Sequence, residues 1–253
     1  MTTGMATCSL LQRLMLALIL LPAGVASART TEKNGLFEMS LEELMAVEIN
    51  TVHSASKYDQ RISEAPSSVT VITADEIRKY GYRTLAEALR SVPGFYVNND
   101  RNYDYLGVRG FRRPGDYDTR VLLLVDGHRT NENVGNSPQS GTSFVLDVDL
   151  IDRIEIIRGP GSSLYGSNAL LGVINVITKD GEALDGLELS GEVGSFDAQK
   201  GRISYGTVFE NGLDLLLSAT ASDSDGQELY FREFDDPATN HGLVRNDDSE
   251  WEN

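Results

Sequence analysis

Residues 154–179 read IEIIRGPGSSLYGSNALLGVINVITK and place two β-branched, strand-like runs on either side of a stretch rich in glycine and serine. A phosphate-binding loop would end in Gly-Lys-Ser/Thr, whereas Gly166 is followed here by Ser167 and Asn168. A nucleophile elbow would need Gly-x-Ser-x-Gly, but Ser163 is followed by Leu-Tyr. Neither enzymatic interpretation fits, and the stretch predicts a strand that ends at Arg-Gly-Pro, a tight turn and a second strand.

The first 28 residues have the composition of a secretory signal peptide. Arg13 precedes an unbroken apolar run over 14–21, and small residues at 26–28 provide a cleavage site. An apolar helix of this length is much shorter than the roughly 30 Å hydrocarbon core, so a permanent membrane anchor is not expected. The single cysteine, Cys8, would leave with this segment, and the mature chain would carry no disulfide.

The charge balance disfavours nucleic acid as a partner. The chain has 38 acidic and 22 basic residues, a formal net charge of −16, and removal of one arginine with the signal peptide would make it −17. The histidines, His53, His128 and His241, are far apart and have no second ligand at metal-binding spacing. We therefore predict neither a metal centre nor a cofactor.

Residues 29–58 are predicted to form a polar leader, and residues 59–182 a compact α+β domain. The run 121–125, Val-Leu-Leu-Leu-Val, is apolar on both faces and predicts a strand buried in the middle of that domain. About 120 residues are enough for a hydrophobic core of their own.

Two short helices are predicted near the start of this domain. Thr73 or Ala74 opens the first helix, and Gly81 ends it. Thr84 followed by Glu87 predicts a capping box at the start of the second helix.

Residues 183–253 alternate apolar with polar or small side chains. The alternation runs through three stretches, 186–196, 201–209 and 212–222. Strands of about ten residues with this pattern are typical of outer-membrane barrels, although a water-soluble sandwich also alternates. The short turn at 210–212 and the long acidic segment after 223 favour the barrel, because such barrels have short turns on one rim and long loops on the other. Three strands would leave two open edges, so we expect only the beginning of a barrel.

Three stretches resemble the plug domain of TonB-dependent outer-membrane receptors. They are LLLVDGHR (122–129), DRIEIIRGPGSSLYGSNALLGVINVITK (152–179) and the preceding APSSVTVITADEIRKYG…LAEALRSVPGFYV…VRGF (65–111). The resemblance covers about residues 40–253 and implies an α+β plug domain followed by the first strands of an antiparallel transmembrane β-barrel, truncated here. It also implies an outer-membrane protein that is not an enzyme, in which the inner-membrane protein TonB pulls on the N-terminal segment to open a path for substrate.

The resemblance assigns roles in holding the plug inside the barrel, which we call seating. Arg109 in VRGF and Arg158 in IIRGP match the two plug arginines of the family that pair with barrel glutamates, and Glu155 is assigned to the same role. The glutamate partners would lie beyond residue 253. The alternative interpretation is that both arginines are solvated at strand ends.

The resemblance also implies a TonB box and substrate-binding loops. The TonB box is an extended segment that adds a strand to a sheet of TonB. Its nearest match is Val47, Glu48, Ile49, Asn50, Thr51 and Val52, which could also be ordinary leader. In the family, outward-facing plug loops contact the substrate, and the matching stretches here are 98–105, 112–118 and 130–136. The residues expected to contact substrate are Tyr103, Arg113, Asp116, Tyr117 and Asn133. The alternative interpretation is that each is only an exposed loop residue.

The function implied by the resemblance is energised uptake of a scarce nutrient such as a ferric siderophore, haem or cobalamin. The partners would be TonB, outer-membrane lipid and the nutrient itself. The alternative is a secreted binding or adaptor module that keeps the plug fold without transport. An exported hydrolase is disfavoured, because the sequence contains no nucleophile–base motif.

Overall fold

The computed structural model describes residues 51–54, 57–58, 60–65, 67–99, 104–112, 116–226 and 228–244. The chain divides into two units, Met1–Glu48 and Ile49–Asn253, and every described residue belongs to the second. The predicted signal peptide and most of the predicted leader therefore lie outside the described residues.

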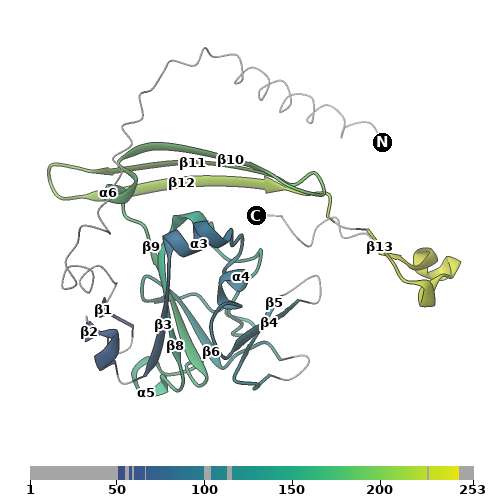
Figure 1. The fold of residues 1–253 in the computed structure, drawn as a ribbon, viewed down its shortest axis with the longest axis horizontal. Helices are drawn as coiled ribbons and strands as arrows, with labels where there is room; N and C mark the ends of the chain where they lie inside the picture. Colours follow the sequence, from purple (N-terminus) through teal and green to yellow (C-terminus); the bar gives the residue numbers. More distant parts are fainter. Residues whose placement is uncertain are drawn as a thin grey trace, which may run out of the picture. The chain divides into compact units, whose positions relative to one another are not determined.

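The predicted α+β domain is built on a five-stranded sheet with the order β3-β8-β9-β6-β7 (Figure 1). Its strands are β3 Ser68–Thr73, β6 Val121–Val125, β7 His128–Arg129, β8 Ile151–Arg158 and β9 Gly172–Thr178. Strand β9 pairs in parallel with β6, and the other neighbouring strands are antiparallel. The two runs that flank the Gly/Ser-rich stretch of 154–179 are thus the paired neighbours β8 and β9.

Strand β6 is buried on both faces, as its composition predicts. Val121 and Leu123 belong to the larger apolar cluster of the domain, while Leu122 and Leu124 belong to a second, smaller one. Successive side chains of a strand point to opposite faces, so the two clusters lie on the two sides of the sheet. An uninterrupted apolar run is what such a position requires.

Helix α3, Ala74–Tyr80, begins and ends where the sequence predicts. The Thr73 N–H donates to the Glu76 carboxylate at 2.9 Å, and the Glu76 N–H donates to Thr73 Oγ1 at 3.3 Å, which together form a complete capping box. Gly81 ends the helix at a φ of +67°, a left-handed conformation that glycine adopts without strain.

Helix α4, Leu85–Leu89, has only half of its predicted capping box. Thr84 accepts a hydrogen bond from the Glu87 N–H, as expected. The Glu87 carboxylate does not return to the Thr84 N–H; it accepts from the N–H and the guanidinium of Arg83 at 2.7 and 2.8 Å. The charged guanidinium of Arg83, the residue before Thr84, therefore takes the place of the neutral Thr84 N–H as a donor to this carboxylate.

Shorter elements complete this domain. Strands β4 and β5 form an antiparallel hairpin, and β1 pairs with β2. Their bounds, with those of the short helices, are β1 Thr51–Val52, β2 Gln60–Arg61, η1 Ile62–Glu64, β4 Phe95–Asn99, β5 Asp104–Val108, η2 Val148–Leu150, α5 Ser162–Tyr165 and α6 Gly181–Leu184.

The alternating segment forms a separate three-stranded antiparallel sheet (Figure 1). Its strands are β10 Gly186–Val193, β11 Gln199–Val208 and β12 Asp214–Asp223. Leu189 pairs with Ile203 on one face, and Glu188 pairs with Ser204 on the other, so the predicted division into an apolar and a polar face is confirmed. The apolar side chains are the exposed ones: Leu189 is 66% and Ile203 50% accessible, whereas Ser204 is 1% accessible.

The long acidic segment after β12 contains little regular structure in its described part. It holds a two-stranded pair and two 3-10 helices: β13 Leu229–Tyr230, η3 Arg232–Phe234, η4 Pro237–Gly242 and β14 Leu243–Val244. In the portion of the chain that the structure describes, no helix has the length and apolar character needed to cross a membrane.

Candidate functional site

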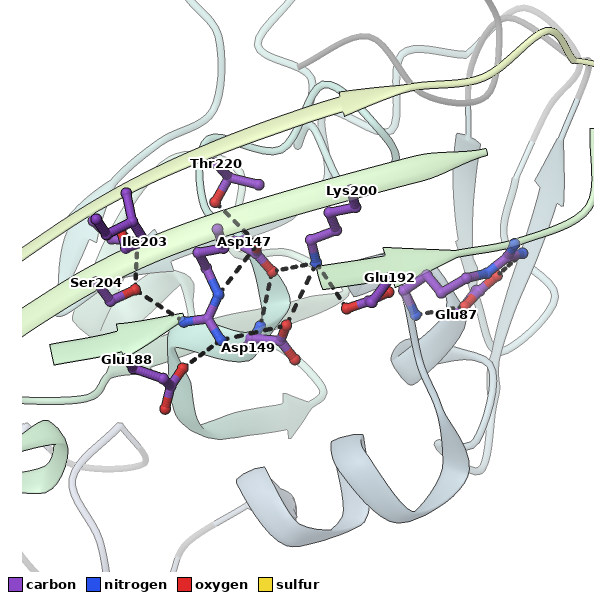
Figure 2. A network of polar contacts seen from close by, with 12 residues as sticks. Glu87, Asp147, Asp149, Glu188, Glu192, Lys200, Ile203, Ser204 and Thr220 are labelled. Atoms are coloured by element: carbon purple, nitrogen blue, oxygen red, sulfur yellow. Dashed lines mark hydrogen bonds and ion pairs between the residues drawn. The ribbon is translucent and has the colours of Figure 1, made fainter. Parts of the chain in front are cut away.

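Charged side chains on the polar face of β10–β12 contact an acidic turn of the α+β domain (Figure 2). We call this cluster the plug–strand network. Its members are Asp147, Asp149, Glu188, Glu192, Lys200, Arg202 and Thr220. Two cations thus lie among four carboxylates where the strands meet the domain.

The acidic turn is positioned by the burial of its neighbours. Val148 and Leu150 are buried in the short helix η2. The carboxylates of Asp147 and Asp149 are directed instead toward the cations of β11. The Asp147 carboxylate also accepts the Asp149 N–H at 3.1 Å, which caps the helix and limits the rotation of the side chain. A contact within the turn itself therefore contributes to the orientation of this acceptor.

Among the described residues, Lys200 provides the closest ion pair between the strands and the acidic turn. Its Nζ donates to Asp147 Oδ1 at 2.8 Å and lies 3.5 Å from Asp149 and 3.7 Å from Glu192 (Figure 2). The Lys200 side chain is 11% accessible and the Asp147 side chain 4%, so water screens this ion pair only weakly.

Arg202, two residues further along β11, bridges a strand and the turn. Its Nη2 lies 2.6 Å from Glu188 on β10 and 3.7 Å from Asp149. Its Nη1 donates to Ser204 Oγ at 3.1 Å, and its Nε, which makes no hydrogen bond, lies 3.8 Å from Asp147. One guanidinium fork therefore contacts carboxylates of both parts.

Asp147 is held in its charged form. Burial alone would raise the pKa of its carboxyl, but the hydrogen bonds from Lys200, the Asp149 N–H and Thr220, with the charge of Lys200, together lower that pKa. An ionised, nearly buried carboxylate depends on its donors, because removal of one partner leaves an uncompensated charge. The network can therefore hold the domain against the strands.

The surroundings of the acidic turn include charged groups and an open cavity. Among the described residues, no group of three or more His, Cys, Asp or Glu side chains has the arrangement of a metal site. The acidic turn also lines an open cavity of about 400 Å³, together with the start of α4, residues 141–146, and Ser218, Thr220 and Ser222 of β12.

The arginines predicted to seat the plug bind within the α+β domain. Arg109 Nη2 donates to the Arg158 carbonyl at 2.9 Å, and Arg158 donates to the Pro93 carbonyl at 3.2 Å and to Ser68 Oγ at 2.5 Å. Arg158 Nε is buried and makes no hydrogen bond. The pairing of both arginines with barrel glutamates stays a prediction.

Glu155 has partners other than the barrel contact expected of it. Its side chain is fully buried. The carboxylate accepts from the N–H and Oγ of Ser54 at 2.9 and 2.5 Å, from the His53 N–H at 3.2 Å and from Arg153 Nε at 3.0 Å. Sequence reasoning did not identify the leader as the source of these donors.

Two of the predicted substrate loops adjoin. Tyr117 and Asn133 are exposed, and a Cβ placed on Gly135 would lie 3.4 Å from the Tyr117 ring. Asp116 forms an ion pair with Arg120 and is therefore directed along its own loop. The other two predicted contact residues, Tyr103 and Arg113, lie outside the described residues.

The predicted TonB box is described only at its end. Val47, Glu48, Ile49 and Asn50 lie outside the described residues, whereas Thr51 and Val52 form β1, which pairs with β2. The Val52 side chain is buried in the smaller apolar cluster, with Leu122, Ile157 and Val173 among its members.

Comparison with known proteins agrees with this architecture. Residues 61–173 match the family model of the TonB-dependent receptor plug domain. The chain is 36% identical over 195 residues to the vitamin B12 transporter BtuB of Vibrio vulnificus, an alignment that covers 74% of this chain and 30% of BtuB. It is 39% identical over 132 residues to the iron-regulated outer membrane virulence protein of Vibrio cholerae, covering 51% of this chain and 20% of that protein.

A solved structure shares the fold. Pseudomonas aeruginosa FpvA, in a complex with a heterologous pyoverdine and iron, superposes with a TM-score of 0.56 at 22% identity, covering 70% of this chain and 22% of FpvA. The chain thus spans less than a third of the length of these relatives. The plug fold, the matched domain and the alternating strands that follow it lead to one assignment: this chain belongs to the TonB-dependent receptors, a family of Gram-negative outer-membrane receptors and not of enzymes.

Proposed function

We propose that this chain supplies the plug and the first barrel strands of a receptor that imports a scarce nutrient with energy from TonB. The observation that carries the proposal is the orientation of β10–β12. Their polar face, with Arg202 and Ser204 buried, contacts the plug, while Leu189 and Ile203 on the other face are exposed. A water-soluble sandwich would bury the apolar face, whereas lipid-facing barrel strands expose it.

The nutrient is a ferric siderophore, haem or cobalamin under this proposal. The relatives support the class: one is a vitamin B12 transporter, one is an iron-regulated outer-membrane protein, and FpvA binds a pyoverdine with iron. The adjoining loops around Tyr117 and Asn133 offer an aromatic ring and an amide to such a polar ligand. TonB would bind the segment that includes Thr51 and Val52 by strand addition.

The test is a binding and uptake screen of the complete receptor. Ferric siderophores, haem and cobalamin are each presented to outer membranes that contain the receptor, and uptake is compared in cells with and without TonB. The proposal expects saturable binding of one class, and accumulation in the cell only with TonB. Binding without TonB-dependent uptake would favour the secreted binding module, and a receptor that fractionates as soluble periplasmic protein would refute the proposal.

A further inference from the structure

A second buried polar cluster joins the leader to the plug at Ser54. The Ser54 side chain is fully buried, and each of its polar groups has a partner in the plug. Its N–H and Oγ donate to Glu155, its Oγ accepts from Asn175 Nδ2 at 2.9 Å, and its carbonyl accepts from Tyr165 Oη at 2.5 Å. All three partners belong to the 154–179 stretch, more than a hundred residues from Ser54 in sequence.

The sheet of the plug positions two of these three groups, Glu155 and Asn175. Glu155 on β8 and Asn175 on β9 are direct cross-strand partners, so their side chains project from the same face of the sheet. The Gly127 N–H donates to Asn175 Oδ1 at 3.0 Å, which directs the amide nitrogen toward Ser54. Tyr165 ends helix α5, and burial and the nearby Glu155 carboxylate both raise its pKa, so its hydroxyl remains a donor.

The leader supplies most of the hydrogen-bond donors to the buried Glu155 carboxylate. Glu155 is fully buried and accepts three of its four hydrogen bonds from His53 and Ser54, while Arg153 provides the fourth. Departure of the leader would leave a carboxylate short of donors, which is costly until water replaces them. The contact between the leader and Glu155 is therefore strong while water is excluded from the carboxylate. It is weak once water can reach the carboxylate and replace the lost donors.

Two flanking contacts place Ser54 in this position. On one side, Val52 is buried in the smaller apolar cluster, which also contains Ala169 and Val173. On the other, Lys57 Nζ lies 4.9 Å from the centre of the Tyr165 ring, a cation–π contact. The last two residues of the predicted TonB box, Thr51 and Val52, are separated from Ser54 only by His53.

We propose that Glu155, Tyr165 and Asn175 form a latch that holds the leader to the plug at Ser54, and that the latch controls how readily the preceding segment detaches. Strand addition to TonB would require Thr51 and Val52 to leave β2 and Val52 to leave the apolar cluster, and the latch is the adjoining polar anchor. The holding function stands on the contacts alone; its effect on TonB rests on the proposed function.

The test measures detachment directly, in outer membranes that contain the complete receptor and without TonB. Tyr58, an exposed residue of the same segment, is replaced by cysteine and spin-labelled, and the mobile fraction is read by electron paramagnetic resonance. Ser54→Ala should raise the ratio of mobile to immobile label roughly tenfold or more, and Tyr165→Phe about fivefold, from the hydrogen bonds lost. Ser63→Ala and Tyr80→Phe, at exposed positions, are the matched controls.

Mobility in Ser54→Ala and Tyr165→Phe that equals that of the controls would overturn the latch. Glu155→Gln extends the test with Glu182→Gln as its exposed control, and because Tyr165→Phe deletes only a hydroxyl, the test holds even if Glu155→Gln fails to fold. TonB-dependent uptake is then measured in the cells from which these membranes were prepared. Raised mobility in the latch variants, without TonB-dependent uptake in any variant or in the wild type, would refute the proposed function and leave the latch intact. Normal uptake with unchanged mobility would refute the latch and leave the proposed function intact.

Discussion

The ion pair between Lys200 and Asp147 joins β11 to the plug, and its loss should appear as a coupling energy in a double-mutant cycle. The cycle compares Asp147→Asn, Lys200→Met and the double variant in the complete receptor. Asparagine keeps the shape of the aspartate without its charge, and methionine keeps most of the lysine's apolar stem. The cycle thus isolates the charge–charge contact from changes in packing.

The size of the effect follows from burial and from the partners that remain. Breaking a fully buried pair costs about 3–5 kcal/mol, because the remaining charge is uncompensated. Here Lys200 would keep Asp149 at 3.5 Å and Glu192 at 3.7 Å, and Asp147 would keep Thr220 and the Asp149 N–H. We therefore expect each single variant to lose about 2–3 kcal/mol of plug stability, with a coupling of about 1–2 kcal/mol.

The assay is urea unfolding of the receptor in detergent micelles, with a fluorescent probe attached at Tyr80→Cys on α3 to report on the plug. The chain provides a control cycle in Arg78 and Asp75, whose ion pair spans 3.5 Å with side chains 71% and 91% accessible. Exposed pairs of this kind couple by less than about 0.5 kcal/mol. A coupling for Asp147 and Lys200 no larger than that of the control pair would refute the argument that the network holds the plug.

Other predictions concern pH, seating and the substrate loops. Burial raises the pKa of the Asp118 carboxyl to about 6, although the hydrogen bond from the Leu106 N–H and the nearby Arg112 oppose this shift. The Asp118 carboxyl therefore binds a proton more tightly in the folded plug than in the unfolded chain. Plug stability should therefore rise by up to about 3 kcal/mol as pH falls from about 6 to about 4, and urea titrations of Asp118→Asn should lack this rise. Replacement of Arg109 and Arg158 by alanine should raise passive leakage of large solutes through the receptor, and unchanged permeability would argue against their seating role. Tyr117→Ala should weaken binding of the nutrient found in the screen about tenfold, whereas Tyr80→Ala on α3 should not, and equal affinities would remove Tyr117 from the binding site.

Local patterns were sufficient to predict most of the elements. The two-residue period of β10–β12 and the apolar run of β6 are properties of neighbouring residues, and both are confirmed. The caps at Thr73 and Gly81 were equally readable. The capping box at Thr84 was predicted incorrectly in its second half, because the sequence does not reveal that Arg83 competes for the same carboxylate.

The polar contacts between distant segments could not be predicted in this way. Lys200 and Arg202, two residues apart, are visibly on the polar face of a strand, but their partner Asp147 is more than fifty residues away. Glu155 gave a clearer signal that was missed: a carboxylate inside an apolar strand must find donors when it is buried. The identity of those donors, at Ser54, depends on the tertiary fold.

The central claim is that β10–β12 direct their apolar face to lipid and their polar face to the plug. Spin labels at Leu189→Cys and Ile203→Cys, in outer membranes that contain the complete receptor, test it by collision with oxygen, which concentrates in the bilayer, and with a water-soluble nickel chelate. Glu210→Cys, in the exposed turn after β11, provides the aqueous reference. We expect both strand labels to collide with oxygen far more than with nickel and the Glu210 label to do the opposite; nickel access at Leu189 and Ile203 equal to that at Glu210 would contradict the account.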